Sequence, residues 1–462
     1  MSSRNRVDLV KLSNEQLALF DYIEGEHTNI FVTGRAGTGK STLLTYLIEN
    51  TKKKFAVCAP TGVAALNVSG QTIHSLFGLP LGLLGTEDVA RHLGRRSREV
   101  LRSIEMLVID EISMVSADLL DAMNRMLIAA RGKNRGPFGG VQVVMFGDPY
   151  QLAPVPPSDP AERGWLAENY QSNWFFDAHV WRDADLERYE LNEIFRQHDE
   201  GFKTILNAIR DGSCTQDMLD EINRAGNRFP PHDDVIRLCT VNSTVDNINS
   251  TRLSKLTTPI KSFEAKFATG DAQTFGRALP VEPTLVLKEG AQVMFVKNDD
   301  QSNRKTKEGY PVKRWVNGTI GHVIQIFNDA HVVVEVDGDE FDVTVSTWEK
   351  VRYEIEEEFD EEAQKFKEVV VPIILAEYQQ IPLRLAWAVT VHKSQGQTYD
   401  EVQIDMGRGA FSPGQTYVAL SRVRSLEGLY LTRAITVKDI MVDDDVLRFM
   451  STKPNAALER II

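Results

Sequence analysis

The 462-residue sequence predicts an α/β protein with two parallel-sheet domains in tandem and a β-rich insertion in the second. Short apolar runs alternate with helical stretches, which is typical of buried parallel strands. These runs form two sets along the chain. The first set is NIFVTG from Asn29, FAVCAP from Phe55, MLVIDE from Met106 and VQVVMFGD from Val141. The second is VIRLCT from Val235, LAWAVT from Leu385, EVQIDM from Glu401 and GLYLTRA from Gly428.

A stretch of different texture interrupts the second set. Between about Val281 and Pro382, short β-runs broken by Gly, Asn and Asp replace the helical periodicity, which indicates a small antiparallel barrel. We therefore predict a first domain over residues 1–185, a second over 186–280 and 383–440, an inserted barrel over 281–382 and a C-terminal tail over 441–462.

Composition and charge limit the classes of protein to consider. No apolar run reaches the roughly 18–20 residues that cross a bilayer, and the N-terminal stretch lacks the apolar core of a secretion signal. Three cysteines lie far apart without a CxxC pair, so we expect a reducing, cytoplasmic location with Cys58 and Cys239 as small core residues. The net charge of −13 argues against nonspecific coating of nucleic acid, although a local basic channel is compatible with it.

The segment GRAGTGKS, from Gly34 to Ser41, matches the phosphate-binding pattern G-x-x-x-x-G-K-[ST]. It lies between a strand-like run and the helical stretch STLLTYLIEN, so backbone N–H groups at a helix N-terminus can surround the phosphates. Lys40 would reach the β- and γ-phosphates, and Ser41 would ligate Mg²⁺. The sequence thus predicts a site for ATP and Mg²⁺.

Two further apolar strands end in polar side chains at the edge of the sheet where α/β folds bind ligands. MLVIDEIS ends in Asp110, which would hold Mg²⁺ mainly through water, and Glu111, which would orient the attacking water. VMFGDPYQLAPV offers Gln151 as a neutral amide that senses the γ-phosphate. A proline-rich turn without that role is the alternative for Gln151.

Two arginines are candidates for stabilising the charge that hydrolysis builds on the γ-phosphoryl oxygens. Arg196 lies in LNEIFRQ at the start of the second α/β domain, and Arg422 lies in YVALSRVRS near its end. If both reach the nucleotide from the second domain, ATP closes an interdomain cleft and hydrolysis opens it, which is a motor stroke. An ordinary surface ion pair is the alternative for each arginine.

Taken together, these motifs resemble a superfamily 1 helicase, and more closely the petite-integration-frequency (Pif) helicases of subgroup B. The similarity extends in order through nearly the whole chain and includes LSNEQ, TGRAGTGKS, APTGVAA, GQTIHSLF, IDEISMVS, GPFGGVQVVMFGD, GDPYQLAPV, FRQ, TVHKSQGQT and YVALSRVRSLEGL. Ala153 departs from the family, where many relatives have proline, but the neighbouring Gln151 is kept.

The resemblance implies a fold and an ATP site. The two α/β domains would be RecA-like, with a wedge insertion at about residues 78–99 of the first and the barrel in the second. Gln16 would be the adenine-binding glutamine, while Lys40, Glu111, Gln151, Arg196 and Arg422 would be catalytic. The further nucleotide-binding residues would be Gly34, Ala36, Gly37, Thr38, Gly39, Ser41, Thr42, Gly396 and Gln397.

A second group of residues is predicted to contact DNA. A buried strand delivers His392, Lys393 and Ser394 to the edge of the second sheet, and such donors suit phosphate oxygens. A structural hydrogen bond is the alternative for each histidine. With their counterparts in the first domain, the predicted DNA contacts are Thr61, Gly62, Thr72, His74, Ser75, Asn242, Thr390, His392, Lys393 and Ser394.

Aromatic side chains add one more candidate for DNA binding. Core packing is the expected role of Phe77 and Trp348. In KRWVNGT, by contrast, a basic pair, an aromatic ring and a turn coincide, so Trp315 is a candidate for stacking on bases.

The resemblance implies an ATP-dependent DNA helicase that moves 5′ to 3′ on single-stranded DNA and unwinds duplexes, in repair, recombination and telomere maintenance. It implies ATP and Mg²⁺ as cofactors, forked or tailed duplexes as substrates, G-quadruplexes and RNA–DNA hybrids as further candidates, and action as a monomer. The short chain favours a bacterial or phage origin; a nuclear or mitochondrial location would apply only to a eukaryotic source. A RecD-like recombination subunit and a nucleotide-switched DNA-binding scaffold are the alternatives.

Overall fold

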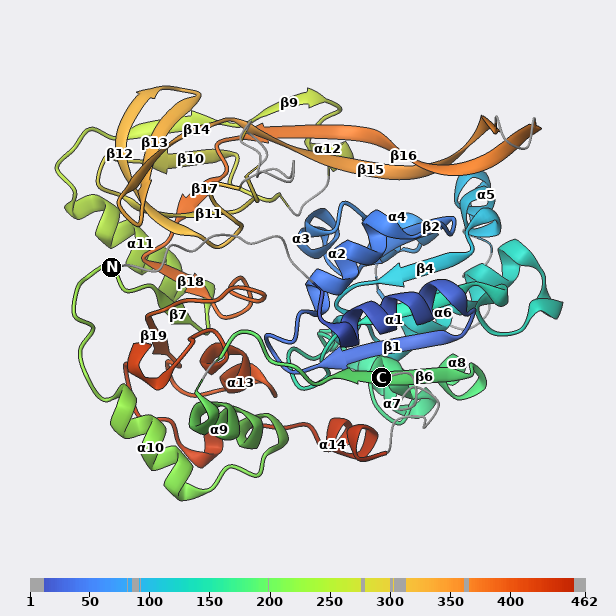
Figure 1. The fold of residues 1–462 in the computed structure, drawn as a ribbon, viewed down its shortest axis with the longest axis horizontal. Coiled ribbons are helices and arrows are strands. Elements are labelled where there is room, and N and C mark those ends of the chain that lie inside the picture. Colours follow the sequence, from blue (N-terminus) through green and yellow to red (C-terminus); the bar gives the residue numbers. More distant parts are fainter. Residues whose placement is uncertain are drawn as a thin grey trace. The chain divides into compact units, whose positions relative to one another are not determined.

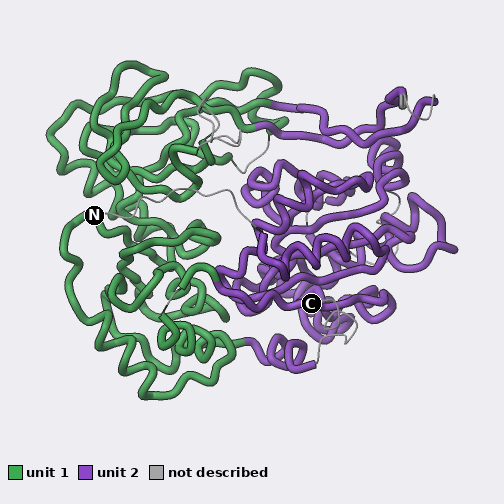
Figure 2. Tube along the Cα trace, viewed as in Figure 1, with its two compact units in different colours: residues 1–11, 195–348, 377–442 green, residues 12–194, 349–376, 443–462 purple. Residues whose placement is uncertain are grey.

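The structure is a computed structural model that describes residues 12–80, 82–84, 91, 93–197, 199–275, 279–299, 302, 313–360 and 365–452. It divides into two compact units (Figure 2). Unit 2 comprises residues 12–194, 349–376 and 443–462, and unit 1 comprises residues 1–11, 195–348 and 377–442. Within the described ranges, no helix is long and apolar enough to cross a membrane.

Unit 2 is built on a six-stranded parallel sheet in the order β3-β2-β4-β5-β1-β6 (Figure 1). Its strands are β1 (Asn29–Gly34), β2 (Phe55–Ala59), β3 (Gln71–Thr72), β4 (Met106–Ile109), β5 (Gln142–Phe146) and β6 (Leu186–Leu191). Its helices are α1 (Asn14–Gly25), α2 (Lys40–Asn50), α3 (Gly62–Asn67), α4 (Ile73–Phe77), α5 (Arg95–Ser103), α6 (Ala117–Arg131), α7 (Pro160–Asn169), α8 (His179–Asp183) and α14 (Asp444–Ser451). The predicted α/β class is confirmed.

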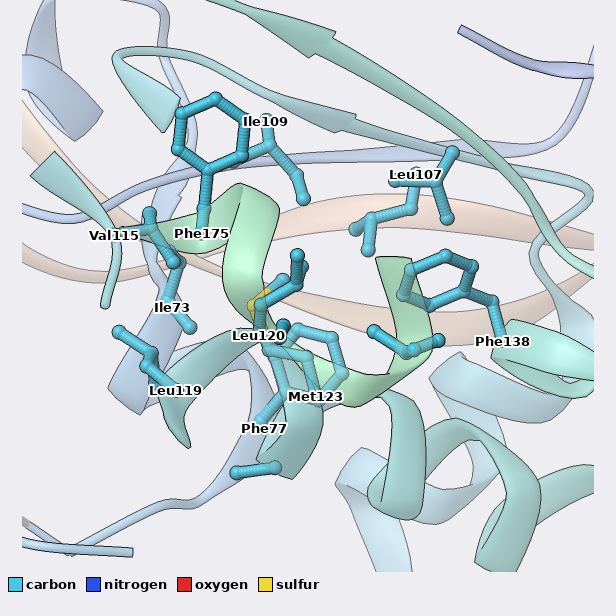
Figure 3. Packing of buried hydrophobic residues seen from close by; sticks show 14 of the residues in the cluster. Ile73, Phe77, Leu107, Ile109, Val115, Leu119, Leu120, Met123, Phe138 and Phe175 are labelled. Atoms are coloured by element: carbon cyan, nitrogen blue, oxygen red, sulfur yellow. The ribbon is translucent and has the colours of Figure 1, made fainter. Parts of the chain in front are cut away.

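Both faces of this sheet are buried, because alternate side chains of each strand point to opposite sides. Ile30 and Val32 pack with apolar residues of α1 and α2, whereas Phe31 between them packs in a second core on the other face. Figure 3 shows part of the second core, where residues of β4 meet residues of α4, α6 and the turns that follow β4 and α6. Cys58 is fully buried there, as predicted.

Two segments from late in the sequence complete unit 2. Strand β15 (Ser346–Asp360) brings Tyr353 into the second core, where its hydroxyl oxygen accepts a 3.2 Å hydrogen bond from the Val57 N–H. Helix α14 brings Phe449, whose ring stacks on Phe176 at a centroid distance of 4.2 Å. The backbone oxygen of Phe449 also accepts a 2.9 Å hydrogen bond from Arg188 of β6.

Unit 1 contains a four-stranded parallel sheet and a separate β-rich region. The parallel sheet has the order β18-β7-β19-β20, with strands β7 (Arg237–Cys239), β18 (Ala388–Thr390), β19 (Val402–Asp405) and β20 (Leu429–Leu431). The helices of this unit are α9 (Glu200–Asp211), α10 (Gln216–Gly226), α11 (Asn242–Lys255), α12 (Ala272–Phe275) and α13 (Gln415–Leu420).

The β-rich region contains a five-stranded antiparallel sheet in the order β14-β13-β12-β11-β17 and a β10-β8 pair. Its strand β9 pairs with the last residues of β16, in a β15-β16-β9 sheet most of which belongs to unit 2. Trp315 lies inside it, 2% exposed and stacked on Phe295 at 4.4 Å, so its ring is core and the stacking role predicted for it is wrong. The strands are β8 (Lys261–Glu264), β9 (Lys266–Thr269), β10 (Thr284–Leu287), β11 (Gln292–Phe295), β12 (Ile320–Asn328), β13 (His331–Val336), β14 (Asp339–Thr344), β16 (Lys365–Gln380) and β17 (Leu383–Leu385).

The structure moves three of the predicted domain boundaries. The first stretch of unit 2 continues to Ile194, whereas the first domain was predicted to end at residue 185, because β6 pairs in parallel with β1. The β-rich region begins with β8, before residue 281, because β8 pairs with β10 and β9 pairs with β16. Residues 349–376 belong to unit 2 instead of the barrel. Residues 81, 85–90 and 92 of the predicted wedge lie outside the described residues, while α5 begins within the wedge at Arg95.

Candidate nucleotide and DNA sites

The phosphate-binding loop connects β1 to α2. Gly34 has a φ of 151°, and a Cβ there would lie 2.7 Å from Thr38 Oγ1 and 2.9 Å from the Leu191 backbone oxygen, so only glycine fits. Gly39 caps α2 in the left-handed region with a φ of 78°. Lys40 Nζ donates to the Gly34 oxygen at 2.6 Å and to the Arg35 oxygen at 3.1 Å, which holds its charge over the loop.

Gln16 lies against this loop. Ser13 and Gln16 form a capping box at the start of α1, in which Gln16 Oε1 accepts from the Ser13 N–H at 3.0 Å. Its Nε2 donates to the backbone oxygens of Thr38 and Gly39, each at 3.3 Å, and the side chain is buried. The helix cap therefore fixes the carboxamide beside the residues that would surround the phosphates.

Asp110 and Glu111 follow β4. This strand pairs with β5, which lies between β4 and β1, the strand that precedes the phosphate-binding loop. The Glu111 N–H donates to Asp110 Oδ1 at 2.9 Å. Glu111 has a φ of 51° and a ψ of 45°, a left-handed conformation that costs a non-glycine residue about 1–3 kcal/mol. Such strain is typical of catalytic positions, since the surrounding structure must impose it.

Burial raises the pKa of Asp110 to about 6, against the opposing effects of the Glu111 N–H and the charge of Lys40. A buried carboxylate of this kind is stabilised in its charged form by a nearby cation. Ser41 in the first turn of α2 and Asp110 both offer hard oxygen ligands, the class that Mg²⁺ takes together with phosphate oxygens and water. The residues present therefore fit Mg²⁺.

Gln151 follows β5 and is buried with Asp148. Its Nε2 donates to Asp148 Oδ2 at 3.1 Å, and its backbone N–H donates to the Asp148 oxygen at 2.9 Å. The tight turn before it packs on η2 (Ile112–Met114), since a Cβ on Gly147 would lie 2.8 Å from Ile112 Cγ2. The carboxamide is thus held at the same end of the sheet as Glu111.

The predicted DNA contacts of unit 2 lie where β2 and β3 end. Thr61 and Thr72 are the N-caps of α3 and α4, and their hydroxyl oxygens accept from the N–H groups of Ala64 and Ser75, each at 3.2 Å. Gly62 and Ser75 lie in the first turns of these helices, whose N-termini suit phosphate oxygens. Burial lowers the pKa of His74, although the charge of Asp118 opposes this shift, so its imidazole is neutral at pH 7.

The predicted DNA contacts of unit 1 cluster in the same way. Thr390 of β18 pairs with Cys239 of β7 in parallel register, so the turn after β18 and the start of α11 at Asn242 share one edge of the sheet. Asn242, His392 and Lys393 are exposed there. Thr390 and Ser394 are exceptions. Thr390 is buried and its hydroxyl oxygen accepts from the Lys393 N–H at 3.3 Å, while Ser394 is fully buried and its hydroxyl donates to the Val391 oxygen at 2.8 Å. Both side chains brace the turn, which corrects the prediction that they contact DNA.

Arg196 and Arg422 both bind the backbone of this turn. Arg422 is 1% exposed, and its Nη1 donates to the Ser394 and Gln397 oxygens at 3.3 and 3.4 Å. Arg196 Nη2 donates to the Gly396 oxygen at 3.1 Å. The surface ion pair considered for Arg422 is therefore wrong, because this guanidinium group is buried among carbonyl oxygens.

Sequence reasoning missed two residues that hold these groups. Gln197 Nε2 donates to the Ser421 and Val423 oxygens at 3.1 and 3.3 Å, which ties the Arg196 segment to the Arg422 segment. Glu15 binds the end of β6 through Tyr189 and Asn192. The only signal for either was its position beside a predicted site residue, Arg196 or Gln16.

Unit 2 therefore has the fold and site of a RecA-like P-loop NTPase. A PIF1-like helicase family model matches residues 11–219. The ATP-dependent DNA helicase Pif1 of Bdellovibrio bacteriovorus is 32% identical over 445 residues, which cover 95% of this chain and 92% of that protein. The ATP-dependent DNA helicase PIF1 of Xenopus laevis is 35% identical over 91% of this chain, but the chain spans only 61% of that longer protein.

Solved structures of Pif1 helicases are also similar to this chain. Bacteroides Pif1 in complex with ADP-AlF4 superimposes with a TM-score of 0.82 at 34% identity, over 96% of this chain and 97% of that one. Bacteroides Pif1 helicase in complex with ADP-AlF3 and ssDNA gives 0.65 at 34% identity, with coverage of 96% and 97%. The chain belongs to the PIF1-like helicase family, which places it among the ATP-dependent DNA helicases and confirms the predicted resemblance.

Proposed function

We propose that this chain uses ATP hydrolysis to move 5′ to 3′ along single-stranded DNA and so to separate duplex DNA. One observation carries the proposal. The two arginines expected to contact the γ-phosphate are hydrogen-bonded to the turn after β18, which is expected to bind DNA. Arg422 and Arg196 donate to the backbone oxygens of Ser394, Gly396 and Gln397, in the turn that exposes His392 and Lys393. A shift of either arginine on hydrolysis would therefore move the DNA-binding turn.

The hydrolytic step is assigned to side chains around the phosphate-binding loop. Gln16 would bind adenine, and Lys40 would bind the β- and γ-phosphates. Glu111 would accept a hydrogen bond from the attacking water and orient it, while Gln151 would sense the γ-phosphate. Mg²⁺ bound by Ser41 and Asp110 would supply charge stabilisation at the phosphate oxygens. Arg196 and Arg422 would stabilise the charge that develops on the transferred phosphoryl group.

Movement requires separate DNA contacts on the two units. In unit 2 the N-termini of α3 and α4 supply backbone donors, and in unit 1 His392, Lys393 and Asn242 supply side chains. Alternating grip between these two sets would advance the protein along one strand. The 5′-to-3′ direction follows from the family and from no single contact.

The finer assignments follow from the same proposal. Single strands and forked or tailed duplexes would be the substrates, with G-quadruplexes and RNA–DNA hybrids as further ones. The protein would act as a monomer, in the cytoplasm of a bacterial or phage-infected cell. Support for the DNA partner comes from Bacteroides Pif1, a relative of known structure with ssDNA.

Strand displacement on matched 5′-tailed and 3′-tailed duplexes tests the proposal. We expect displacement of the 5′-tailed duplex with ATP and Mg²⁺, little displacement of the 3′-tailed one, and none by Lys40→Ala or Glu111→Gln. Equal action on both tails would refute the direction. ATP turnover that single strands do not stimulate would favour a nucleotide-switched scaffold, and a need for a nuclease partner would favour a RecD-like subunit.

A further inference from the structure

The side chain of Glu15 joins helix α1 to the end of strand β6. One oxygen, Glu15 Oε1, accepts three hydrogen bonds: from the Tyr189 hydroxyl at 3.1 Å, from the Asn192 N–H at 3.1 Å and from Asn192 Nδ2 at 3.3 Å. Tyr189 lies within β6, and Asn192 is the first residue beyond its end. The same carboxylate therefore fixes the strand and the direction in which the chain leaves it.

Hydrogen bonds join α1 to β6 at two places along the helix, Glu15 and Tyr22. Tyr189 is 8% exposed, and burial followed by the charge of Glu15 raises the pKa of its phenol, so it stays a donor at every physiological pH. About two turns further along α1, the Tyr22 hydroxyl donates to Glu187 Oε2 at 2.6 Å. The start of α1 thus cannot shift relative to β6 without breaking several hydrogen bonds.

Glu15 and Asn192 each lie close in the chain to a residue that is expected to act on ATP. Glu15 precedes Gln16, whose carboxamide lies on the phosphate-binding loop at Thr38 and Gly39. Asn192 precedes Arg196 by four residues, which span at most about 13–14 Å of extended chain. A displacement at Asn192 would therefore be passed to Arg196 over a short connection.

We propose that Glu15 is a positioning residue for ATP hydrolysis: it fixes the start of the segment that carries Arg196 to the helix that binds the base. Glu15 does not act on the nucleotide itself. It sets where the arginine segment begins, and through it how well Arg196 is placed when the phosphoryl group is transferred. This inference rests on the proposed ATPase, in which Gln16 binds adenine and Arg196 stabilises the transition state.

A simpler role for Glu15 makes different predictions. An acidic residue in the first turn of a helix is stabilising because it interacts with the helix dipole. That role depends on the negative charge, whereas the positioning role depends on an oxygen acceptor at Oε1. Glu15→Gln removes the charge and keeps the acceptor, so the two roles can be separated.

The test compares steady-state ATP hydrolysis with saturating single-stranded DNA in the full chain. We expect Glu15→Ala to lower kcat about tenfold or more, because a displacement of about 1 Å at a catalytic group can cost about 10²-fold. KM for ATP should stay within about twofold, since Glu15 does not bind the nucleotide. Glu15→Gln should keep kcat within about twofold of wild type.

Glu24 in the same helix provides a matched control for stability. Its carboxylate accepts from Thr51 Oγ1 at 2.8 Å and from the Lys52 N–H at 2.9 Å, and neither partner lies in β6. Glu24→Ala should therefore lower Tm by a similar amount to Glu15→Ala while leaving kcat within about twofold of wild type.

Three results would overturn the inference: a kcat of Glu15→Ala within about twofold of wild type, a change in KM alone, or equal loss in Glu15→Gln and Glu15→Ala. A wild-type protein without DNA-stimulated hydrolysis would be a different failure, because it removes the proposed function and this inference with it. The wild-type rate, measured first, distinguishes the two failures.

Discussion

Arg196 and Arg422 meet at Ser421 in unit 1. Arg196 Nη1 donates to the Ser421 backbone oxygen at 3.2 Å, and Arg422 Nη2 donates to the Ser421 hydroxyl at 2.8 Å. Burial, and then the charge of Arg422, lower the pKa of Arg196 to about 9, which still leaves it charged at pH 7. Two guanidinium groups held this close repel each other, so an anion bound between them would be strongly stabilised.

Replacing Arg422 should abolish efficient hydrolysis. We expect Arg422→Ala to lower turnover at saturating ATP by about 10³-fold or more, the usual effect of losing such an arginine. Arg422→Lys should not restore it, because the fork of guanidinium donors reaches the Val418, Ser394 and Gln397 oxygens together. Because Arg422 is buried, Tm and nucleotide binding must be measured beside turnover. Turnover within about twofold of wild type would remove Arg422 from the catalytic set.

Alanine variants of two glycines in the β-rich region should distinguish an effect on stability from an effect on ATP hydrolysis. Gly318 and Gly338 have φ values of 94° and 84°, so alanine at either should cost about 1–2 kcal/mol. A Cβ at Gly338 would meet nothing within 4 Å, whereas one at Gly318 would overlap the carboxamide of Gln397. We expect Gly318→Ala to displace this flexible side chain and to lower DNA-stimulated kcat, and we expect the same of Gln397→Ala. Gly338→Ala should lose similar stability in thermal unfolding but keep kcat, and equal kcat in both glycine variants would contradict this account.

Asp439 should make stability depend on pH. Burial alone would raise its pKa, but hydrogen bonds from Arg433, Thr436 and Ala410 outweigh burial and hold the pKa far below its usual value. A carboxyl group whose pKa is lowered by folding stabilises the protein above its unfolded pKa, about 3.9, and loses that effect as the pH falls towards the folded pKa. We expect Asp439→Asn to lower the free energy of unfolding by about 2 kcal/mol at pH 7.

Urea unfolding at pH 7, 5 and 3 checks this prediction. The difference between wild type and Asp439→Asn should be the same at pH 7 and 5 and should shrink at pH 3. A difference that does not depend on pH would show that the carboxylate charge of Asp439 is unimportant.

Lys393 and His392 should differ in the salt dependence of single-strand binding. Each phosphate neutralised by a cation contributes about 0.7 to the slope of log affinity against log salt on single strands. Desolvation lowers the pKa of His392, so it is neutral at pH 7.5. We expect Lys393→Ala to reduce the slope by about 0.7, and His392→Ala to weaken binding without changing the slope. An unchanged slope in Lys393→Ala would place this lysine away from the phosphates.

The parts of the fold that depend on local sequence could be predicted. The strand before Gly34 and the strand before Asp110 are continuous apolar runs, and the phosphate-binding loop is a contiguous motif. Strand β6 was missed, because Glu187, Arg188 and Glu190 interrupt its apolar pattern and hide its pairing with β1.

The parts that depend on distant contacts could not be predicted. The pattern around Trp315 gave no sign that Phe295, on another strand, covers its ring. Arg422 was an expected site residue, but its burial among carbonyl oxygens depends on the fold of the whole Thr390–Gln397 turn. The three hydrogen bonds at Glu15 join residues about 175 positions apart, and no local pattern reports such a pair.

Directional movement powered by ATP is the central claim, and release of streptavidin from biotinylated single strands measures it without a duplex. With ATP and Mg²⁺, wild type should release streptavidin rapidly from oligonucleotides biotinylated at the 3′ end and slowly from those biotinylated at the 5′ end. Lys40→Ala should release neither. Release that is equal at the two ends, or that continues in Lys40→Ala, would contradict the claim.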